Sequence, residues 1–156
     1  AINAQLPFEE HVALGAALAP LRERGVMIVG SGNIVHNLAR VDWRLEDDGF
    51  DWAWRFDEAA REVLQSDPAS VPSLVDHPDY AAAVPTPDHF IPMLYVAGLA
   101  AASGERPEVL VDGCSPRSET GARWRVDGGV TVGDSASLPG RLYSDPGPTA
   151  VVARHR

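Results

Sequence analysis

The sequence predicts an α/β fold of three layers, in which helices cover both sides of a mostly parallel central sheet. Amphipathic helical segments alternate along the chain with short, continuous apolar runs, and a Gly-rich turn directly follows the first of these runs. Short apolar runs are typical of strands that are buried on both faces, and helix–strand–turn alternation is typical of parallel sheets. With 156 residues, the chain is expected to form one domain or part of one.

Composition excludes several classes of partner. The formal net charge of −9 argues against nucleic acid, whose phosphates require a basic surface. No apolar run approaches the roughly 20 residues that span a bilayer, and the first residues lack a signal peptide's basic start and apolar core. Cys114 is the single cysteine, which excludes an internal disulfide framework. We therefore expect a cytoplasmic protein without a membrane partner, and the sequence leaves its oligomeric state open.

The chain changes character near Cys114. Residues 1–113 carry seven Arg against 18 acidic residues, whereas residues 114–156 carry six Arg against four and are interrupted by Pro and Gly. Sparse apolar residues between such breaks favour loose packing. The sequence therefore predicts an α/β domain over 1–113 and an atypical, loosely structured tail over 114–156.

Three helices are predicted from apolar periodicity. The first, over Pro7–Arg24, begins at a proline and places three leucines on one stripe: Leu14, Leu18 and Leu21. The second, over Trp52–Ser66, separates an apolar from a charged face. The third runs over Ile91–Ala102, where Pro92 requires a late start or a kink.

Two apolar runs, Val26–Val29 and Glu108–Val111, are predicted to be central strands with their following turns on the same side of the sheet. In the tail, Arg123–Val126 and Gly129–Val132 indicate a hairpin at the edge of the sheet.

The motif GSGNIVHNL follows the first predicted strand. Two glycines allow a sharp turn that leaves backbone amides facing a ligand, and Gly32, Asn33 and His36 would line that crevice. A dinucleotide site is disfavoured, since Val35 occupies the place of the third glycine of GxGxxG, and no GxSxG nucleophile motif is present. A tight turn in which His36 merely caps or packs fits the spacing equally well.

The motif PTPDHFIP precedes the third helix. Its prolines fix an extended approach, and Thr86 or Asp88 can cap the helix, which would hold His89 rigidly at the helix start as metal ligation requires. The pattern alone favours a half-buried His89 without such a role. Among the other histidines, His11 and His155 are expected on the surface, and His77 in a solvated loop.

Together, GSGNIVHNL and PTPDHFIPMLYVAGLA resemble the class III extradiol ring-cleaving dioxygenases, most closely the 4,5-DOPA dioxygenase-type branch of the LigB superfamily. The likeness runs from about Leu6 to Gly113, so that 1–113 would be the C-terminal part of the catalytic domain. It implies that His36 is an acid/base and that His89 is a metal ligand. Asn33 and the amides around Gly32 are expected to line the same cleft and to donate to substrate oxygens. The implied metal is non-haem Fe(II), or Zn(II) as bound in some members.

The resemblance also implies a reaction, in which a catechol-type ring is opened with O2. Family members carry two further metal-binding His in a preceding stretch that has no counterpart here, which leaves open that the chain is inactive alone. A non-catalytic α/β domain that binds a metal or small molecule is the alternative, and an α/β hydrolase or phosphorylase is a weaker one. A dioxygenase site requires the imidazoles of His36 and His89 to face one cleft, within about a substrate's width of each other.

Overall fold

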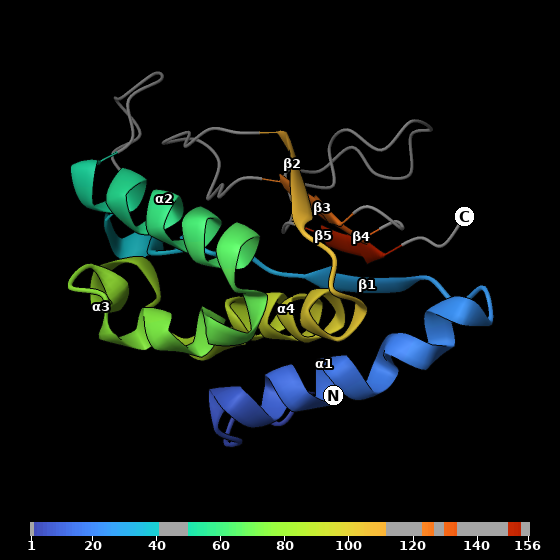
Figure 1. Cartoon of the computed structure of the whole chain (residues 1–156). Helices are drawn as coiled ribbons and strands as arrows, with labels where there is room; N and C mark the ends of the chain where they lie inside the picture. Colours follow the sequence, from blue (N-terminus) through green and yellow to red (C-terminus); the bar gives the residue numbers. More distant parts are fainter. Residues whose placement is uncertain (1, 41–49, 112–122, 127–129, 134–149, 154–156) are drawn as a thin grey trace, which may run out of the picture.

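The computed structural model describes residues 2–40, 50–111, 123–126, 130–133 and 150–153, with side chains described up to residue 107 (Figure 1). Gly113, Cys114 and His155 lie outside these ranges. The described helices are α1 (Phe8–Glu23), η1 (Leu38–Arg40), α2 (Asp51–Ser66), η2 (Pro68–Asp76), α3 (Tyr80–Ala83), η3 (Pro87–His89) and α4 (Ile91–Ser103). In the described part of the chain, no helix is long and apolar enough to cross a membrane.

The three long helices are confirmed close to their predicted bounds. In α2 the buried face is formed by Ala53, Phe56, Asp57, Ala60 and Leu64. Pro92 does not kink α4, because it lies in the first turn, where its missing N–H needs no partner within the helix. Nearly all of α4 is buried, which makes it the central helix of the fold.

The sheet has five strands in the order β1-β5-β4-β3-β2, and every neighbouring pair is antiparallel. The strands are β1 (Ile28–Ser31), β2 (Pro107–Val111), β3 (Arg123–Val126), β4 (Val130–Gly133) and β5 (Ala150–Ala153). The α/β class is therefore found, but the mostly parallel sheet predicted from the sequence is not found among the described strands. β1 and β2 run in the same direction, yet three strands separate them.

The predicted central strands lie at the two edges of this sheet. The first also begins later than expected, at Ile28 instead of Val26. The tail hairpin is confirmed as β3 and β4, but it occupies the middle of the sheet because β5 pairs with β1 on one side and β2 pairs with β3 on the other. The first run is also not buried as predicted, since Val26, Met27 and Val29 are 41%, 44% and 51% exposed. An apolar run leaves the choice of strand partner undetermined. How tightly the side chains of the tail pack stays a prediction.

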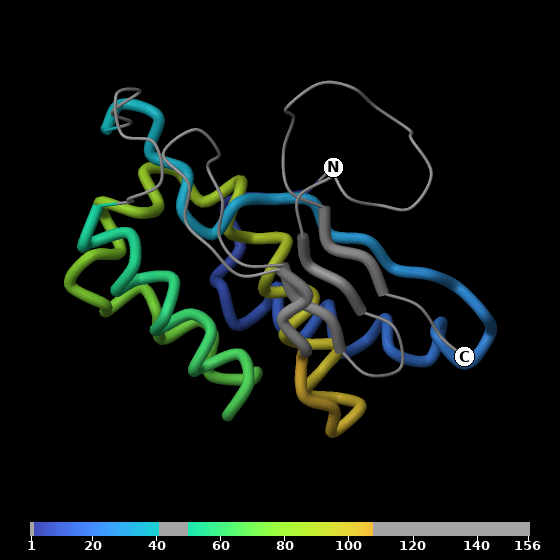
Figure 2. Tube along the Cα trace, turned by 90° about the horizontal axis from the view of Figure 1, so that it is seen from above, coloured from blue at the N-terminus to red at the C-terminus, as the bar shows by residue number. Residues whose placement is uncertain are grey.

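The helices α1 and α4 form two successive layers on one side of β1, instead of one layer on each side of the sheet. Figure 1 shows α4 between α1 and the sheet, and α4 contacts β1 and β5. The chain runs from α1 along β1 to η1 at the far end of the molecule, where α2 begins (Figure 2).

The fully buried residues of α1 are small or polar, in contrast to the predicted leucine stripe, while Phe8 and Val12 pack against the core as partly buried residues. The buried residues are His11, Gly15 and Arg22, while Leu14 is 44% exposed. A Cβ at Gly15 would lie 2.2 Å from the carbonyl oxygen of Tyr95 on α4, and a Cβ at Gly98 would lie 2.0 Å from the carbonyl oxygen of Val12. The two backbones therefore approach so closely that larger side chains do not fit between them.

His11 is fully buried, so its expected surface position is wrong. Its Nδ1 lies 3.3 Å from the Tyr95 hydroxyl, and its Nε2 has no hydrogen-bond partner among the described residues. At the other end of α1, Arg22 donates to Ser103 Oγ over 2.7 Å and pairs with Glu105 over 2.9 Å. Polar contacts thus align both ends of α1 with α4.

Replacing Gly98 by Ala is expected to destabilise the protein by about 1–3 kcal/mol, because the added Cβ overlaps backbone atoms of α1 that cannot rotate away. Urea unfolding measures the change. Ala17→Ser on the exposed side of α1 is the matched control and should leave the midpoint nearly unchanged. Equal midpoints for Gly98→Ala and wild type would contradict the close α1–α4 approach.

The stability should also fall in mild acid because of His11. Burial lowers the pKa of this imidazole from its ordinary value, so its contribution is present above the unfolded pKa of about 6.5 and is lost as the pH falls through the folded pKa. Urea midpoints measured between pH 8 and pH 5 should decline less steeply in His11→Gln than in the wild type. If the urea midpoints of the variant and the wild type fell equally between pH 8 and pH 5, protonation of His11 would not contribute to the loss of stability.

Candidate functional site

The turn after β1 and the turn before α4 meet at Gly32. A Cβ at this buried glycine would lie 2.2 Å from the carbonyl oxygen of His89 and 3.1 Å from Cγ of Pro92. Only a residue without a side chain permits this approach, which brings two segments more than fifty residues apart into van der Waals contact. Gly32 therefore has a steric role in joining the two sequence motifs.

The same contact places the two histidines side by side. The ring centroids of His36 and His89 are 4.9 Å apart with an interplanar angle of 35°. His36 is 7% exposed, whereas the side chain of His89 is 38% exposed, with its Nε2 3.4 Å from an Asp88 carboxylate oxygen. The predicted proximity of the imidazoles is confirmed; that they share a substrate cleft stays a prediction.

Both ring nitrogens of His36 face backbone carbonyls. Nε2 lies 2.8 Å from the Thr86 oxygen and Nδ1 lies 3.1 Å from the Asn33 oxygen. A neutral ring with its proton on Nε2 donates to the closer carbonyl, and a ring that also takes up a proton at Nδ1 donates to both. Burial and the neighbouring His89 lower the pKa of His36 against the opposing effect of these carbonyls. His36 is thus held in one orientation in both protonation states.

Asn37 and α3 secure this position of His36. The Asn37 side-chain amide donates to the Ala82 carbonyl over 2.7 Å, and the His36 backbone N–H donates to the Ala83 carbonyl over 2.9 Å. The sequence analysis did not single out Asn37, although an amide side chain directly after the motif histidine is a usable signal. The predicted capping of the third helix by Thr86 or Asp88 is wrong, since Phe90 is the N-cap residue of α4 and makes no side-chain cap hydrogen bond.

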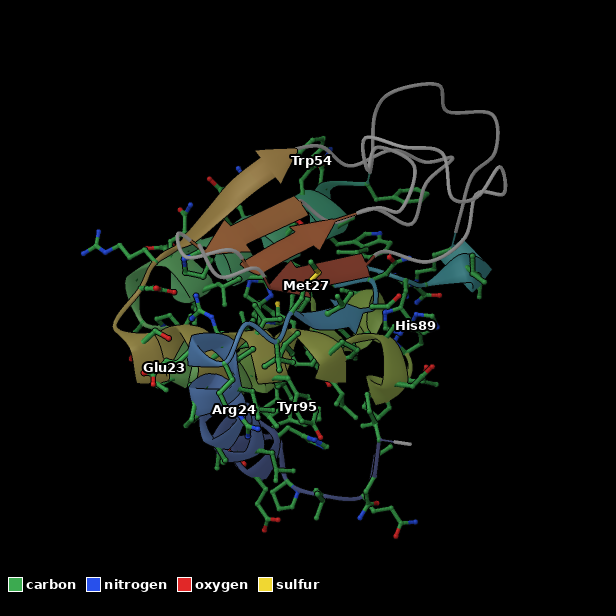
Figure 3. All side chains as sticks on the ribbon, turned by 90° about the vertical axis from the view of Figure 1, so that its right-hand side faces the viewer. Glu23, Arg24, Met27, Trp54, His89 and Tyr95 are labelled. Atoms are coloured by element: carbon green, nitrogen blue, oxygen red, sulfur yellow. The ribbon has the colours of Figure 1, made fainter. Side chains whose placement is uncertain are left out.

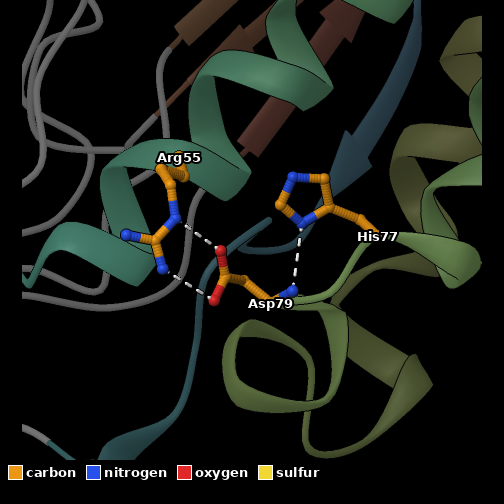
Figure 4. A network of polar contacts seen from close by, with 3 residues as sticks. All are labelled: Arg55, His77 and Asp79. Carbon is orange, nitrogen blue, oxygen red and sulfur yellow. Dashed lines mark hydrogen bonds and ion pairs between the residues drawn. The ribbon is translucent and has the colours of Figure 1, made fainter.

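A polar network joins α3 to α2 (Figure 4). The Arg55 guanidinium donates to both carboxylate oxygens of Asp79, over 2.9 and 3.0 Å, and holds the pKa of that carboxyl below its ordinary value. The Asp79 backbone N–H donates to Nδ1 of His77 over 3.1 Å. The ring of His77 packs edge-on against Phe56. His77 is therefore part of the scaffold that positions α3, behind His36.

Of the predicted site residues, Gly32, Asn33, His36 and His89 all belong to this one junction. Asn33 is buried, and its carbonyl faces His36. In the part of the chain that the structure describes, no three His, Cys, Asp or Glu side chains gather closely enough to hold a metal ion. The side chains of His89 and Asp88 are 38% and 60% exposed and lie side by side; that His89 binds a metal stays a prediction.

The family assignment agrees with this geometry. Residues 1–122 match the family described as the catalytic LigB subunit of aromatic ring-opening dioxygenase. The chain therefore belongs to the LigB family.

Individual relatives carry more specific names. The chain is 37% identical over 110 residues to a 4,5-DOPA dioxygenase extradiol of Escherichia coli K12, covering 68% of this chain and 40% of the relative. A Beta vulgaris protein of the same name is 32% identical over 111 residues, covering 70% and 41%. The crystal structure of an uncharacterized Escherichia coli K12 protein aligns with a TM-score of 0.68 at 27% identity, covering 98% of this chain and 53% of that one. The chain thus spans about two fifths of the length of its named relatives.

Substituting Gly32 by Ala is expected to separate the two histidines, because the added methyl group overlaps the His89 carbonyl. We expect a loss of about 1–3 kcal/mol in stability and a loss of NOE contacts between the two imidazole rings. Ala39→Ser, at an exposed position of η1, is the control. Retention of the ring contacts in Gly32→Ala would refute the steric role of this glycine.

Proposed function

We propose that this chain provides one metal ligand and the acid/base residue of an extradiol dioxygenase site that opens catechol-type rings with O2. The observation that carries the proposal is the contact of the His36 and His89 rings, with centroids 4.9 Å apart, in a LigB-family chain. The metal would be Fe(II), or Zn(II), and the protein would act in the cytoplasm.

The residues present fit part of such a metal site. The His89 imidazole is exposed, neutral imidazole is a good ligand for iron and zinc, and Asp88 adds negative charge beside it. Facial-triad iron sites use three protein ligands, so the remaining ligands must come from outside the described residues. When bound, the metal would supply Lewis-acid activation of the catechol oxygens and of O2.

His36 is proposed to move the protons of the reaction. Its lowered pKa keeps the ring neutral and able to take a proton from a catechol hydroxyl. With Nε2 donating to Thr86, Nδ1 is the nitrogen that is free of a proton in the neutral ring. Once Nδ1 takes up a proton it donates to the Asn33 carbonyl, so the charged ring is held without turning. Gly32 and Asn33 are proposed to line the substrate position.

A chimera tests these roles. The matched 110 residues of the Escherichia coli relative are replaced by the corresponding residues of this chain, so that the relative's other segments complete the domain. Metal content and catechol ring opening are then measured. We expect turnover, loss of bound metal in His89→Ala, and a kcat lowered about 10²–10⁴-fold with metal retained in His36→Ala. Ala17→Ser, on the exposed side of α1, is the control.

The alternative, a non-catalytic domain that binds a metal or small molecule, predicts a different outcome. Under this alternative, the chimera would fold and bind metal but would not open a catechol ring. Wild-type turnover in His36→Ala would remove the acid/base role, and full metal content in His89→Ala would remove the ligand role.

A further inference from the structure

The short helix α3 connects Arg55 to the histidine pair. At the end of α3, the carbonyls of Ala82 and Ala83 have no donor within the helix, as is usual at a helix C-terminus. They accept hydrogen bonds from the Asn37 side chain over 2.7 Å and from the His36 backbone N–H over 2.9 Å. The backbone of His36 is therefore held in place by α3.

A helix of one turn does not hold its own position. α3 spans only Tyr80–Ala83, and a single hydrogen-bonded turn is unstable in water without contacts to the rest of the protein. The ring of Tyr80 packs edge-on against Phe56 of α2 and against Phe90, which directly follows the second histidine. α3 thus contacts the segments of both histidines, and a shift of α3 would alter the spacing of the pair.

The ion pair between Arg55 and Asp79 fixes the start of α3 (Figure 4). Asp79 is the N-cap residue of α3, and its side chain is 14% exposed, whereas the side chain of Arg55 is 58% exposed. The two hydrogen bonds of 2.9 and 3.0 Å form a bidentate fork, which fixes the orientation of both groups as well as their distance. Without the guanidinium, a mostly covered carboxylate would lose its countercharge and turn toward water, which would move the start of α3 outward.

We propose that Arg55, which lies outside both sequence motifs, is a positioning residue for His36, because its ion pair at the start of α3 fixes the carbonyls at the end of α3 that hold this histidine. This inference rests on the proposed function, since it takes His36 to be the acid/base. Proton transfer is sensitive to a misplacement of the acid/base by only about 1 Å. An exposed ion pair contributes little to the free energy of unfolding, so the loss of Arg55 should affect turnover more than stability.

Arg55→Gln in the full chain tests the proposal by NMR, without metal and without turnover. The measurements are the hydrogen-exchange rate of the His36 backbone amide, which donates to Ala83, and the NOE between the rings of His36 and His89. We expect this amide to exchange about tenfold faster and the ring NOE to weaken, while the urea midpoint stays near the wild-type value. Arg55→Lys keeps the charge without the planar fork and should restore part of the protection.

Arg24→Gln is the matched control, because it also removes an exposed guanidinium, at the end of α1, where Figure 3 labels it. Its exchange rates and ring NOE should equal those of the wild type. Wild-type protection of the His36 amide in Arg55→Gln overturns the proposal. A loss of protection throughout the core together with a lowered urea midpoint also overturns it, because Arg55 would then stabilise the whole fold instead of placing one residue.

The chimera with the Escherichia coli relative measures the consequence for catalysis. Arg55→Gln should lower kcat about tenfold and leave the metal content and the KM for the catechol unchanged, and Arg55→Lys should recover part of kcat. An unchanged kcat overturns the positioning role while the dioxygenase site stands. If the chimera without this substitution opens no ring, the proposed function is wrong, whereas the His36 amide still decides whether Arg55 holds this histidine in place.

Discussion

The missing side chain of Gly32 is the constraint on which the site depends. Because nothing projects from this residue, the turn after β1 lies directly on the backbone of His89, and the rings of His36 and His89 become neighbours. Within this junction, the carbonyls of Asn33 and Thr86 face the two ring nitrogens of His36 and fix the orientation of the ring. A steric condition at one position therefore determines the chemistry available at two others.

This junction is supported from behind by α4. The helix begins immediately after His89, and it is held against α1 by the close approaches at Gly15 and Gly98. On the opposite side, the carbonyls of α3 bind His36 and Asn37, while Arg55 and Asp79 connect α3 to α2. Side chains that act at a precise distance need rigid supports of this kind. The site is thus built from backbone contacts between helices, with few polar side chains.

Much of the site could be predicted from sequence because its signals are local. The Gly-rich turn and the proline-fixed turn each specify a backbone conformation. Because both motifs together resemble one family, His36 and His89 could be predicted to share a site. Which face of α1 is buried could not be predicted in this way, because the helix packs through Gly15, buries His11 and leaves Leu14 exposed. Hydrophobic periodicity assumes that contact is made by large apolar side chains. The strand order could not be predicted either, because the partner of each strand depends on distant segments. The apolar run Val26–Val29 ends in an edge strand in which Val29 is exposed.

The pairing of β1 with β5 has a consequence for the order of assembly. These two strands come from opposite ends of the chain, so their contact closes a very long loop, whereas α1, β1 and α4 lie within the first 103 residues. The entropic cost of closing a loop rises with the length of the loop, and pairings between distant strands therefore form slowly. During synthesis, the helices and both histidines emerge from the ribosome before β5 exists. The histidine pair can accordingly assemble on a helical nucleus, and the sheet is completed onto it afterwards.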